Sequence, residues 1–494
     1  MMHLQQEASR CLLCADAPCS KLCKNGDPAR AIRAVRFGNK NLARKWIENC
    51  SEAELEAAEK ACIHYDSPIR IREMIKQMPD LPDVKELPSL AIDFCGIHCE
   101  NPFFLASSAV STNYDMVAKA FDAGWGGAFF KTICLQEIKE VSPRFDAMHV
   151  KGTSDIYSFR NMEQLSENTP QEDFSTLHRL KKDYPQKVLV ASIMGKTENE
   201  WVQLARRAEA AGADAVELNF SCPQMRLAGM GSDVGQNSEL VLFYTACVKH
   251  AVDIPVIPKM TPNITHISQP GMAALFAGAD AISAINTIKS VTMDPRSEVS
   301  GHRCISGLSG RAVKPIALRY ILELANHLTT SNVSRLGHKV ELSGIGGIES
   351  WRDALEFIQL GCRNVQVCTA VMQYGNRIIE DLKLGMQHYM AERGVSALED
   401  LVGEQLHTFV AASDMDRDTV VYPMIDREVC IGCGRCYTSC HNGGHQAIIF
   451  DETRKPHMDG SKCVGCQLCM LVCPTGAIGL SKRVMKKPSS PLSA

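Results

Sequence analysis

The sequence predicts an α/β protein whose largest part is a TIM (β/α)8 barrel, with a cysteine-rich segment on either side of it. Between about residues 90 and 395, short apolar runs alternate with amphipathic segments of helical periodicity. Continuous apolar runs are typical of strands buried on both faces, as in a parallel sheet covered by helices. The eight runs are PFFLASS, GAFFKTI, KVLVASIMG, AVELNFS, PVIPKM, AISAINT, VELSGIGG and NVQVCTA.

The residues at the ends of these runs favour a barrel over a doubly wound open sheet, which would show the same alternation. Seven runs end at or near a polar residue or a glycine, namely Ser107, Lys131, Asn219, Lys259, Asn286, Gly346 and Thr369. In a TIM barrel the carboxyl ends of all strands converge on one face, where active sites of this fold are built. The sequence therefore predicts a functional site at that face.

Size and composition limit the other possibilities. The 494 residues are 45% hydrophobic and 22% charged, which excludes collagen, coiled coil and wholesale disorder. Lys and Arg number 53 against 56 Asp and Glu, a net charge of -3, so we expect no nucleic acid and no anionic membrane as partner. No apolar stretch approaches the roughly 18 residues that span a bilayer, and the start lacks a secretory signal, so we expect a cytoplasmic protein.

The expected domains follow in order along the chain. Residues 1–85 show helical spacing and predict a small helical domain, which ends in a proline-rich linker. The barrel is expected at 86–395, a polar linker at 396–420, a compact cysteine-rich module at 421–482 and a frayed tail at 483–494. Of the 22 cysteines, 12 fall in the two cysteine-rich segments, and such clustering indicates metal ligation rather than disulfides in a reducing compartment.

The N-terminal segment carries the motif Cys11-x2-Cys14-x4-Cys19-x3-Cys23. Four thiolates at this spacing could hold a 4Fe-4S cluster or a structural zinc ion. Cys50 and Cys62 are spare thiols that could replace one of these ligands, so the ligand set and the metal stay open.

The C-terminal segment carries two runs of the bacterial two-cluster ferredoxin type. They are Cys430-x2-Cys433-x2-Cys436-x3-Cys440 and Cys463-x2-Cys466-x2-Cys469-x3-Cys473. In this pattern the fourth cysteine of each run ligates the cluster of the other run. We therefore expect two 4Fe-4S clusters in a ferredoxin-like module, one on Cys430, Cys433, Cys436 and Cys473 and one on Cys463, Cys466, Cys469 and Cys440. A pair of zinc ribbons is the alternative, and His441 departs from the pattern where the second run has Pro474.

In the barrel, Cys222 follows a strand end and precedes a proline, so its thiol could act as a general acid; a buried structural cysteine is the alternative. Lys131 and Lys259 would be costly to bury without an anion or an electron-rich ring, unless they lie at the surface. Gly346 and Gly347 lie in SGIGGIE, where backbone N–H groups can approach a phosphate. Flavin mononucleotide (FMN) would satisfy these groups together, whereas no dinucleotide-binding, P-loop or H-E-x-x-H motif occurs.

From residue 86 to the tail the chain resembles the catalytic subunits of bacterial NAD-dependent dihydropyrimidine dehydrogenases. The matching stretches include AGWGGAFFKT, RNMEQL, ELNFSCPQM, GMGSDVGQ, SGLSGRAVKPIALR, SGIGGIES and both ferredoxin runs. The N-terminal stretch CLLCADAPCSKLC resembles the cysteine-rich helical domain that precedes the FAD domain of glutamate synthase small subunits and dihydropyrimidine dehydrogenases.

The resemblance implies a role for each residue of the barrel site. Cys222 would donate a proton to C5 of a pyrimidine base while FMN delivers hydride to C6. Asn161, Asn219, Asn286 and Thr287 would hold the base. FMN would be bound by Ser107, Lys131, Thr132, Lys259, Gly346, Gly347, Cys368 and Thr369.

The implied activity is the reversible reduction of uracil or thymine, with electrons passed through the 4Fe-4S clusters. A separate FAD- and NAD(P)H-binding flavoprotein would supply them, which implies a hetero-oligomer. The N-terminal domain departs from the family, because the family places it beside FAD and NAD(P)H domains. A dihydroorotate dehydrogenase and a non-catalytic electron carrier are the alternative functions.

Overall fold

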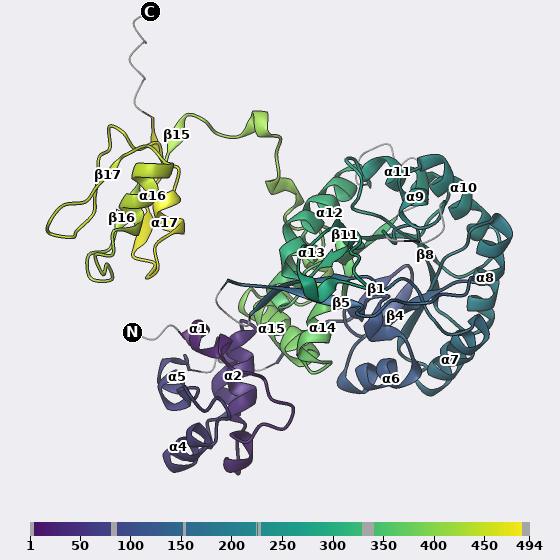
Figure 1. Cartoon of the computed structure of the whole chain (residues 1–494), viewed down its shortest axis with the longest axis horizontal. Helices are drawn as coiled ribbons and strands as arrows, with labels where there is room; N and C mark the ends of the chain where they lie inside the picture. Colours follow the sequence, from purple (N-terminus) through teal and green to yellow (C-terminus); the bar gives the residue numbers. More distant parts are fainter. Residues whose placement is uncertain are drawn as a thin grey trace, which may run out of the picture. The chain divides into compact units, whose positions relative to one another are not determined.

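The computed structural model describes residues 4–80, 86–151, 155–223, 225, 229–328 and 340–486. The chain divides into two compact units, Met1–His407 and Thr408–Ala494. The boundary expected at residue 85 lies inside the first unit, in which the N-terminal helices pack against the barrel (Figure 1).

The first unit contains a closed barrel of eight parallel strands, which confirms the predicted fold class. Around the barrel the strands follow one another in chain order, and β14 closes the ring against β3, with Val367 beside Leu105. The strands are β3 (Phe103–Leu105), β4 (Gly127–Ile133), β7 (Val188–Ile193), β8 (Ala215–Asn219), β9 (Val256–Lys259), β10 (Ala281–Ala284), β13 (Glu341–Ile345) and β14 (Cys362–Val367). Seven of them lie within a predicted run, and β14 begins two residues before the run NVQVCTA at 364–370.

Helices cover the outer face of the barrel (Figure 1). They are α6 (Tyr114–Ala123), α7 (Pro170–Asp183), α8 (Glu198–Ala210), α9 (Ser232–Gly235), α10 (Ser238–Lys249), α11 (Ser268–Phe276), α12 (Lys314–Leu328), α13 (Trp351–Gln359), α14 (Thr369–Tyr374) and α15 (Ile378–Glu392). Capping boxes at Thr169 and Ser350 fix where α7 and α13 begin, because each hydroxyl accepts a hydrogen bond from an otherwise unpaired N–H. Every residue of β4 and β7 is buried, as expected for strands between a helical layer and the barrel interior.

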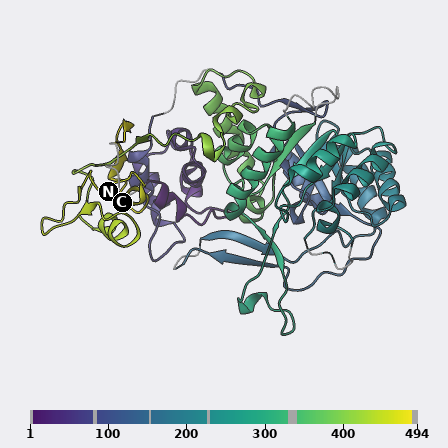
Figure 2. The same cartoon turned by 90° about the horizontal axis from the view of Figure 1, so that it is seen from above.

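Two further sheets in this unit were not predicted. A hairpin, β1 (Ile92–Phe94) and β2 (Ile97–Cys99), precedes the barrel. A four-stranded antiparallel sheet in the order β11-β12-β6-β5 is built from the loops that follow β4 and β10. Its strands are β5 (Phe145–His149), β6 (Ile156–Asn161), β11 (Ile288–Ser290) and β12 (Ser306–Ser309), and it projects from one side of the barrel (Figure 2).

The N-terminal part of this unit is helical, as predicted. It contains α1 (Leu4–Ser9), α2 (Pro28–Arg36), α3 (Lys40–Ala43), α4 (Glu52–Lys60) and α5 (Ile71–Gln77). Asp27 caps α2, and a capping box at Ser51 begins α4. These short helices share a small apolar core that includes Ile32, Val35 and Leu55.

The second unit folds as a small two-layer module. Three antiparallel strand pairs join β15 (Thr419–Val420) to β20 (Val484–Met485), β16 (Pro423–Ile425) to β19 (Ile478–Leu480) and β17 (Ile448–Ile449) to β18 (His457–Met458). Two helices, α16 (Arg435–Gly443) and α17 (Leu468–Leu471), pack on each other. The small core contains several cysteines, so apolar burial alone stabilises this module little.

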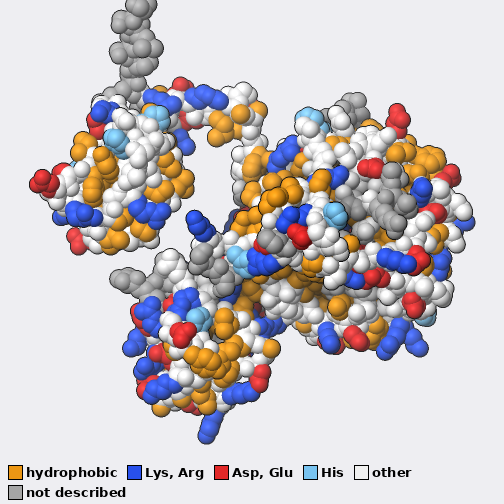
Figure 3. Space-filling model, viewed as in Figure 1, with side chains coloured by type: hydrophobic (Ala, Val, Ile, Leu, Met, Phe, Trp, Pro, Cys, Tyr) orange, Lys and Arg blue, Asp and Glu red, His pale blue; other side chains and the backbone are white. Residues whose placement is uncertain are grey.

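Neither unit shows a membrane-spanning element, because none of the described helices is both long and apolar enough to cross a bilayer. On the face of the first unit visible in Figure 3, Lys and Arg side chains are interspersed with Asp and Glu. That face therefore shows no large field of one sign, and the net charge of the whole chain is -3.

Candidate functional site

A pocket lies at the carboxyl ends of the barrel strands, and its empty volume is about 1080 Å³ including the solvent at its mouth. Every barrel residue singled out in the sequence lines it. They are Ser107, Lys131, Thr132, Asn161, Asn219, Cys222, Lys259, Asn286, Thr287, Gly346, Gly347, Cys368 and Thr369. Asn161 lies on β6, so the unpredicted antiparallel sheet supplies part of the wall together with Phe145, Phe159 and Leu308.

A chain of hydrogen bonds fixes the amides and hydroxyls of this pocket. The Thr132 hydroxyl contacts Ser192 at 2.9 Å and Ser107 at 3.2 Å. Asn219 Nδ2 donates to Thr132 Oγ1 at 2.9 Å, and Asn219 Oδ1 accepts from Ser221 Oγ at 2.8 Å. Asn286 Nδ2 donates to Ser221 Oγ at 2.9 Å. Since each group is held by a neighbour on another strand, the amide edges are oriented before any ligand binds.

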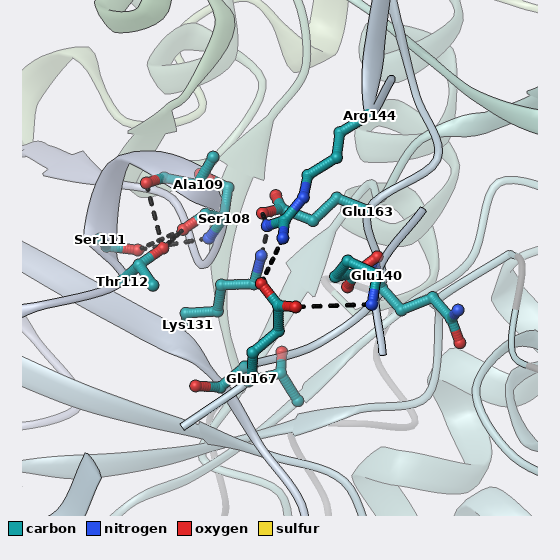
Figure 4. A network of polar contacts seen from close by, with 12 residues as sticks. Ser108, Ala109, Ser111, Thr112, Lys131, Glu140, Arg144, Glu163 and Glu167 are labelled. Carbon is teal, nitrogen blue, oxygen red and sulfur yellow. Dashed lines mark hydrogen bonds and ion pairs between the residues drawn. The ribbon is translucent and has the colours of Figure 1, made fainter. Parts of the chain in front are cut away.

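Both buried lysines of the pocket face carboxylates. Lys131 Nζ lies 2.8 Å from Glu163 Oε2, and Glu163 also contacts Arg144 at 3.3 Å (Figure 4). Lys259 Nζ lies 3.5 Å from Glu217 Oε1, and both side chains are at most 3% exposed. Sequence reasoning missed Glu163 and Glu217, although a carboxylate partner is what a buried lysine requires.

Three glycines form a close-packed wall where backbone approaches the pocket. Gly346 and Gly347 have φ values of +131° and +75°. A Cβ on Gly346 would lie 2.8 Å from Ala317 Cβ, and one on Gly347 would lie 2.9 Å from the Gly310 carbonyl oxygen. Beside them, Thr369 Oγ1 donates to Ser309 Oγ at 3.0 Å. This wall presents backbone amides and hydroxyls rather than bulky side chains, and so has room for a phosphate.

Three buried polar atoms of the pocket wall lack a partner within the described part of the chain. They are Gln164 Oε1, Glu349 Oε1 and Gln366 Oε1. Burial raises the pKa of the Glu349 carboxyl to about 7, against a lowering by the nearby charges of Arg311 and Arg36. Unsatisfied polar atoms at a pocket wall are typical of groups that a ligand completes.

Cys222 lies in the loop after β8, and its residue is only 5% exposed. Its carbonyl oxygen accepts a hydrogen bond from Ser232 N at 2.9 Å, and Gly231 packs so closely that a Cβ there would lie 2.5 Å from that oxygen. The loop backbone on either side of the thiol is thereby fixed at the pocket wall.

The N-terminal cysteines surround a second, smaller pocket of about 410 Å³ of empty volume. Its cysteines are Cys11, Cys14, Cys19 and Cys62, and its apolar wall includes Ile32, Ile69 and Ile71. Burial, followed by the charges of Cys11, Cys62 and Cys14, raises the pKa of Cys19 to about 11. The fourth cysteine is thus Cys62, which follows α4.

Cys23, the fourth predicted ligand, is not among the residues of this pocket. Burial and a hydrogen bond with Cys50 raise the pKa of its thiol to about 12. The structure therefore pairs Cys23 with Cys50 and leaves Cys11, Cys14, Cys19 and Cys62 around the pocket.

Among the C-terminal cysteines, one from the first run lies near those of the second run. Burial, followed by the charges of Cys440, Cys463 and Cys466, raises the pKa of Cys469 to about 11. Burial, followed by the charges of Cys433 and Cys430, likewise raises the pKa of Cys436. Cys440, the last cysteine of the first run, therefore lies with the second run.

No three Cys, His, Asp or Glu side chains among the described residues converge closely enough to hold a single metal ion. A tetrahedral zinc site with Zn–S bonds of about 2.3 Å would require its sulfurs to lie close together. The N-terminal cysteines instead line a pocket of about 410 Å³ of empty volume.

Two family models match parts of this chain. The family model described as dihydroorotate dehydrogenase matches residues 89–390, and the one described as 4Fe-4S dicluster domain matches residues 423–480. The N-terminal helices lie outside both matches.

Three relatives illustrate the range of similarity. The chain is 49% identical over 405 residues to the NAD-dependent dihydropyrimidine dehydrogenase subunit PreA of Escherichia coli, covering 81% of this chain and 97% of the relative. It is 36% identical to the chloroplastic dihydropyrimidine dehydrogenase (NADP(+)) of Arabidopsis thaliana, over 66% of this chain and 79% of the relative. It is 35% identical to the catalytic subunit of dihydroorotate dehydrogenase B (NAD(+)) of Thermococcus kodakarensis, over 64% of this chain and 97% of the relative.

The barrel, the C-terminal module and these similarities agree with one another. The chain belongs to the dihydroorotate dehydrogenase family and, within it, to the dihydropyrimidine dehydrogenase subunits related to PreA.

Proposed function

We propose that the chain reversibly reduces the C5=C6 bond of uracil or thymine to the 5,6-dihydropyrimidine at FMN. The observation that carries the proposal is that a buried thiol, three amides and two carboxylate-paired lysines line one pocket beside a glycine wall. The similarity to dihydropyrimidine dehydrogenase subunits supports the same substrate class.

The pocket fits FMN in three respects. The wall of Gly346 and Gly347 presents backbone to a phosphate, because a Cβ on either residue would clash with neighbouring protein atoms, and Thr369 adds a hydroxyl there. Lys131 and Lys259 would lie at the electron-rich ring, with Ser107, Thr132 and Cys368 beside it. When bound, the flavin supplies or accepts a hydride at C6 of the base.

The base would be held by Asn161, Asn219, Asn286 and Thr287. An amide offers one acceptor and two donors, which match the alternating carbonyl and N–H groups of a pyrimidine edge. Because Asn219 and Asn286 are both tied to Ser221, their orientation is set by the protein and does not have to be fixed during binding.

Cys222 would provide the proton at C5. Hydride arrival at C6 builds enolate charge on the C4 carbonyl, because the C5=C6 bond is conjugated to it, and protonation at C5 relieves that charge. An ordinary thiol has a pKa of about 8.5 and so carries its proton at neutral pH. In the reverse direction the thiolate would remove the C5 proton as a general base.

The charge pattern favours a neutral base over orotate. Orotate carries a carboxylate at C6, which requires an additional cation or amide donors. Lys131 and Lys259 are the only cationic side chains among the described residues of the wall, and each already faces a carboxylate. Dihydroorotate dehydrogenase therefore remains the second candidate, supported by the relative from Thermococcus kodakarensis.

Electrons would pass to and from the barrel through iron-sulfur clusters. In the C-terminal module, one 4Fe-4S cluster is assigned to Cys430, Cys433, Cys436 and Cys473, and the other to Cys463, Cys466, Cys469 and Cys440. We assign a third to Cys11, Cys14, Cys19 and Cys62, with Cys62 in place of Cys23. Since the relative from Escherichia coli is named as a subunit, we infer a hetero-oligomer with an FAD- and NAD(P)H-binding flavoprotein.

An anaerobic absorbance titration of the holoenzyme tests the proposed function. Dihydrouracil should bleach the flavin band, whereas dihydroorotate at the same concentration should leave it unchanged. Bleaching by dihydroorotate alone would assign the chain to the second candidate. A bound flavin that neither compound bleaches would refute both.

A further inference from the structure

We propose that the N-terminal cysteine pocket is a second electron port, meaning that a cluster bound there takes electrons from the flavin of the same chain and passes them to another protein. It is built by docking the loop Cys11–Cys14 onto the junction of α14 and α15. The inference rests on the proposed function, because it requires a flavin in the barrel and a cluster on Cys11, Cys14, Cys19 and Cys62. Neither family model covers the N-terminal helices, so neither assigns them a role.

Two arginines hold the backbone of the cysteine loop. Arg377, between α14 and α15, donates from Nη1 to the Cys14 carbonyl oxygen at 3.1 Å and from Nη2 to that of Leu13. Arg36, at the end of α2, donates from Nη1 to the Cys11 carbonyl oxygen at 2.6 Å. Three carbonyl groups of the loop are thus held by two guanidinium groups, one of which belongs to the barrel.

The contact between the cysteine loop and the barrel lies next to the flavin pocket. The Arg36 guanidinium lies 5.3 Å from the ring centre of Tyr374, and Phe37 packs on that ring edge-to-face at 5.1 Å. Tyr374 is the last residue of α14, and Thr369, the first, lines the flavin pocket. Six helical residues at 1.5 Å each span about 9 Å, so one short helix separates the docked loop from the pocket wall.

A second group of contacts makes the docking rigid. Arg33 Nε donates to Asp381 Oδ2 at 2.6 Å, and Arg30 and Arg33 both contact Glu380. Asn39 Nδ2 donates to the Asp381 carbonyl oxygen at 2.8 Å. Arg33 is 8% exposed and Asp381 4%, and separating such a pair would leave buried charges without partners. The cysteine pocket is therefore held at one position on the barrel.

The electron count of the port is simple. Oxidation of a dihydropyrimidine at the flavin releases two electrons and two protons, and a 4Fe-4S cluster accepts one electron at a time. The electrons would pass singly to a one-electron acceptor protein of the ferredoxin or flavoprotein class, and the protons leave to solvent. Leu12 and Ile63, which line the cysteine pocket, are 58% and 38% exposed, so a protein acceptor can approach the cluster there.

The test uses the full chain with both C-terminal clusters disabled by Cys433→Ser and Cys466→Ser. After anaerobic addition of dihydrouracil, frozen samples are examined by electron paramagnetic resonance. We expect the signal of a reduced cluster, and we expect it to be absent when Cys62→Ser is added. A flavin bleached by dihydrouracil beside a cluster that only dithionite reduces would overturn the port and leave the proposed function intact. An unbleached flavin would instead overturn the proposed function.

A second measurement keeps the C-terminal module intact. Arg36→Ala and Arg377→Ala should retain iron and flavin but slow reduction of the N-terminal cluster by about tenfold in rapid-freeze experiments. Arg377→Lys keeps one donor and should restore most of the rate, and Arg206→Ala on α8 serves as the control without effect. Unchanged cluster reduction in both alanine variants would show that the docking contact does not carry the transfer.

Discussion

The barrel pocket and the N-terminal cysteine pocket lie in one compact unit but are built in different ways. In the barrel, the site residues follow strands whose order and register are fixed by closure of the sheet. In the N-terminal region, the cysteines lie on loops between helices of four to nine residues. Position in the sequence therefore predicts position in space far better in the barrel.

The cysteine spacing illustrates the difference. Cys19 and Cys23 are separated by the 3-10 turn η1 (Ser20–Leu22), and the thiol of Cys23 is hydrogen-bonded to Cys50 rather than lining the pocket. Cys62, 39 positions beyond Cys23, takes the fourth place because α4 and α5 bring it back. A ligand set in such a domain is decided by packing of the loops and not by local spacing.

The largest expected effect tests this ligand exchange. Cys62→Ser should remove all iron of the N-terminal site, whereas the matched variant Cys23→Ser should retain it, because only Cys62 lines the pocket. Iron analysis and electron paramagnetic resonance of both purified variants measure this. Loss of iron in Cys23→Ser with retention in Cys62→Ser would restore the ligand set that spacing predicts.

The next effect tests the barrel site. Cys222→Ala should keep flavin bound and lower turnover by roughly 10²- to 10⁴-fold, the usual contribution of a positioned general acid. Steady-state rates with uracil or dihydrouracil measure it, with Cys247→Ala on α10 as the control cysteine outside the pocket. Turnover that stays at the control level would remove Cys222 from the mechanism.

A smaller effect tests the glycine wall. Gly347→Ala places a Cβ 2.8 Å from Lys314 Cβ in a left-handed conformation, so we expect FMN affinity to fall by about tenfold or more. Equilibrium dialysis of the apoprotein with FMN measures this. Gly375 has a similar φ of +79°, and a Cβ there would have no atom within 4 Å. Gly375→Ala therefore separates the effect of backbone strain from that of the steric clash at the wall. Equal affinity losses in both variants would argue against a phosphate at Gly347.

The smallest effect concerns pH. Burial raises the pKa of Glu349 to about 7, so the acid is neutral below that pH and charged above it. A charged carboxylate at the pocket wall repels the FMN phosphate, and affinity should fall by less than about tenfold as pH rises from 6 to 8. Glu349→Gln should remove this dependence, apart from the titration of the phosphate itself. The same pH profile in wild type and variant would exclude Glu349 as its source.

Much of the barrel could be predicted because its strands are buried on both faces. Seven of the predicted runs contain a whole barrel strand and the eighth contains most of β14, and the polar ends of the runs face one pocket. The antiparallel sheet of β5, β6, β11 and β12 could not be found this way. Its strands are short and largely half-buried, as in FDAMH and IKS, and the pairs β5-β6 and β11-β12 are joined only through β6 and β12, where Gly307 pairs with Asn161, 146 positions away. Apolar periodicity carries little information on such pairings.

The sequence by itself determined the barrel, the helical N-terminal region and the two closely spaced cysteine runs of the C-terminal module. Buried strands, amphipathic helices and closely spaced ligands are local features that periodicity and spacing record directly. Only the tertiary structure decided that Glu163 and Glu217 pair with the pocket lysines, that Cys62 joins the N-terminal pocket, and that Arg36 and Arg377 dock it on the barrel. These contacts join residues that are from 25 to 363 positions apart, and they form only because burial of a charge, a thiol or a carbonyl group requires a partner wherever the fold brings one close.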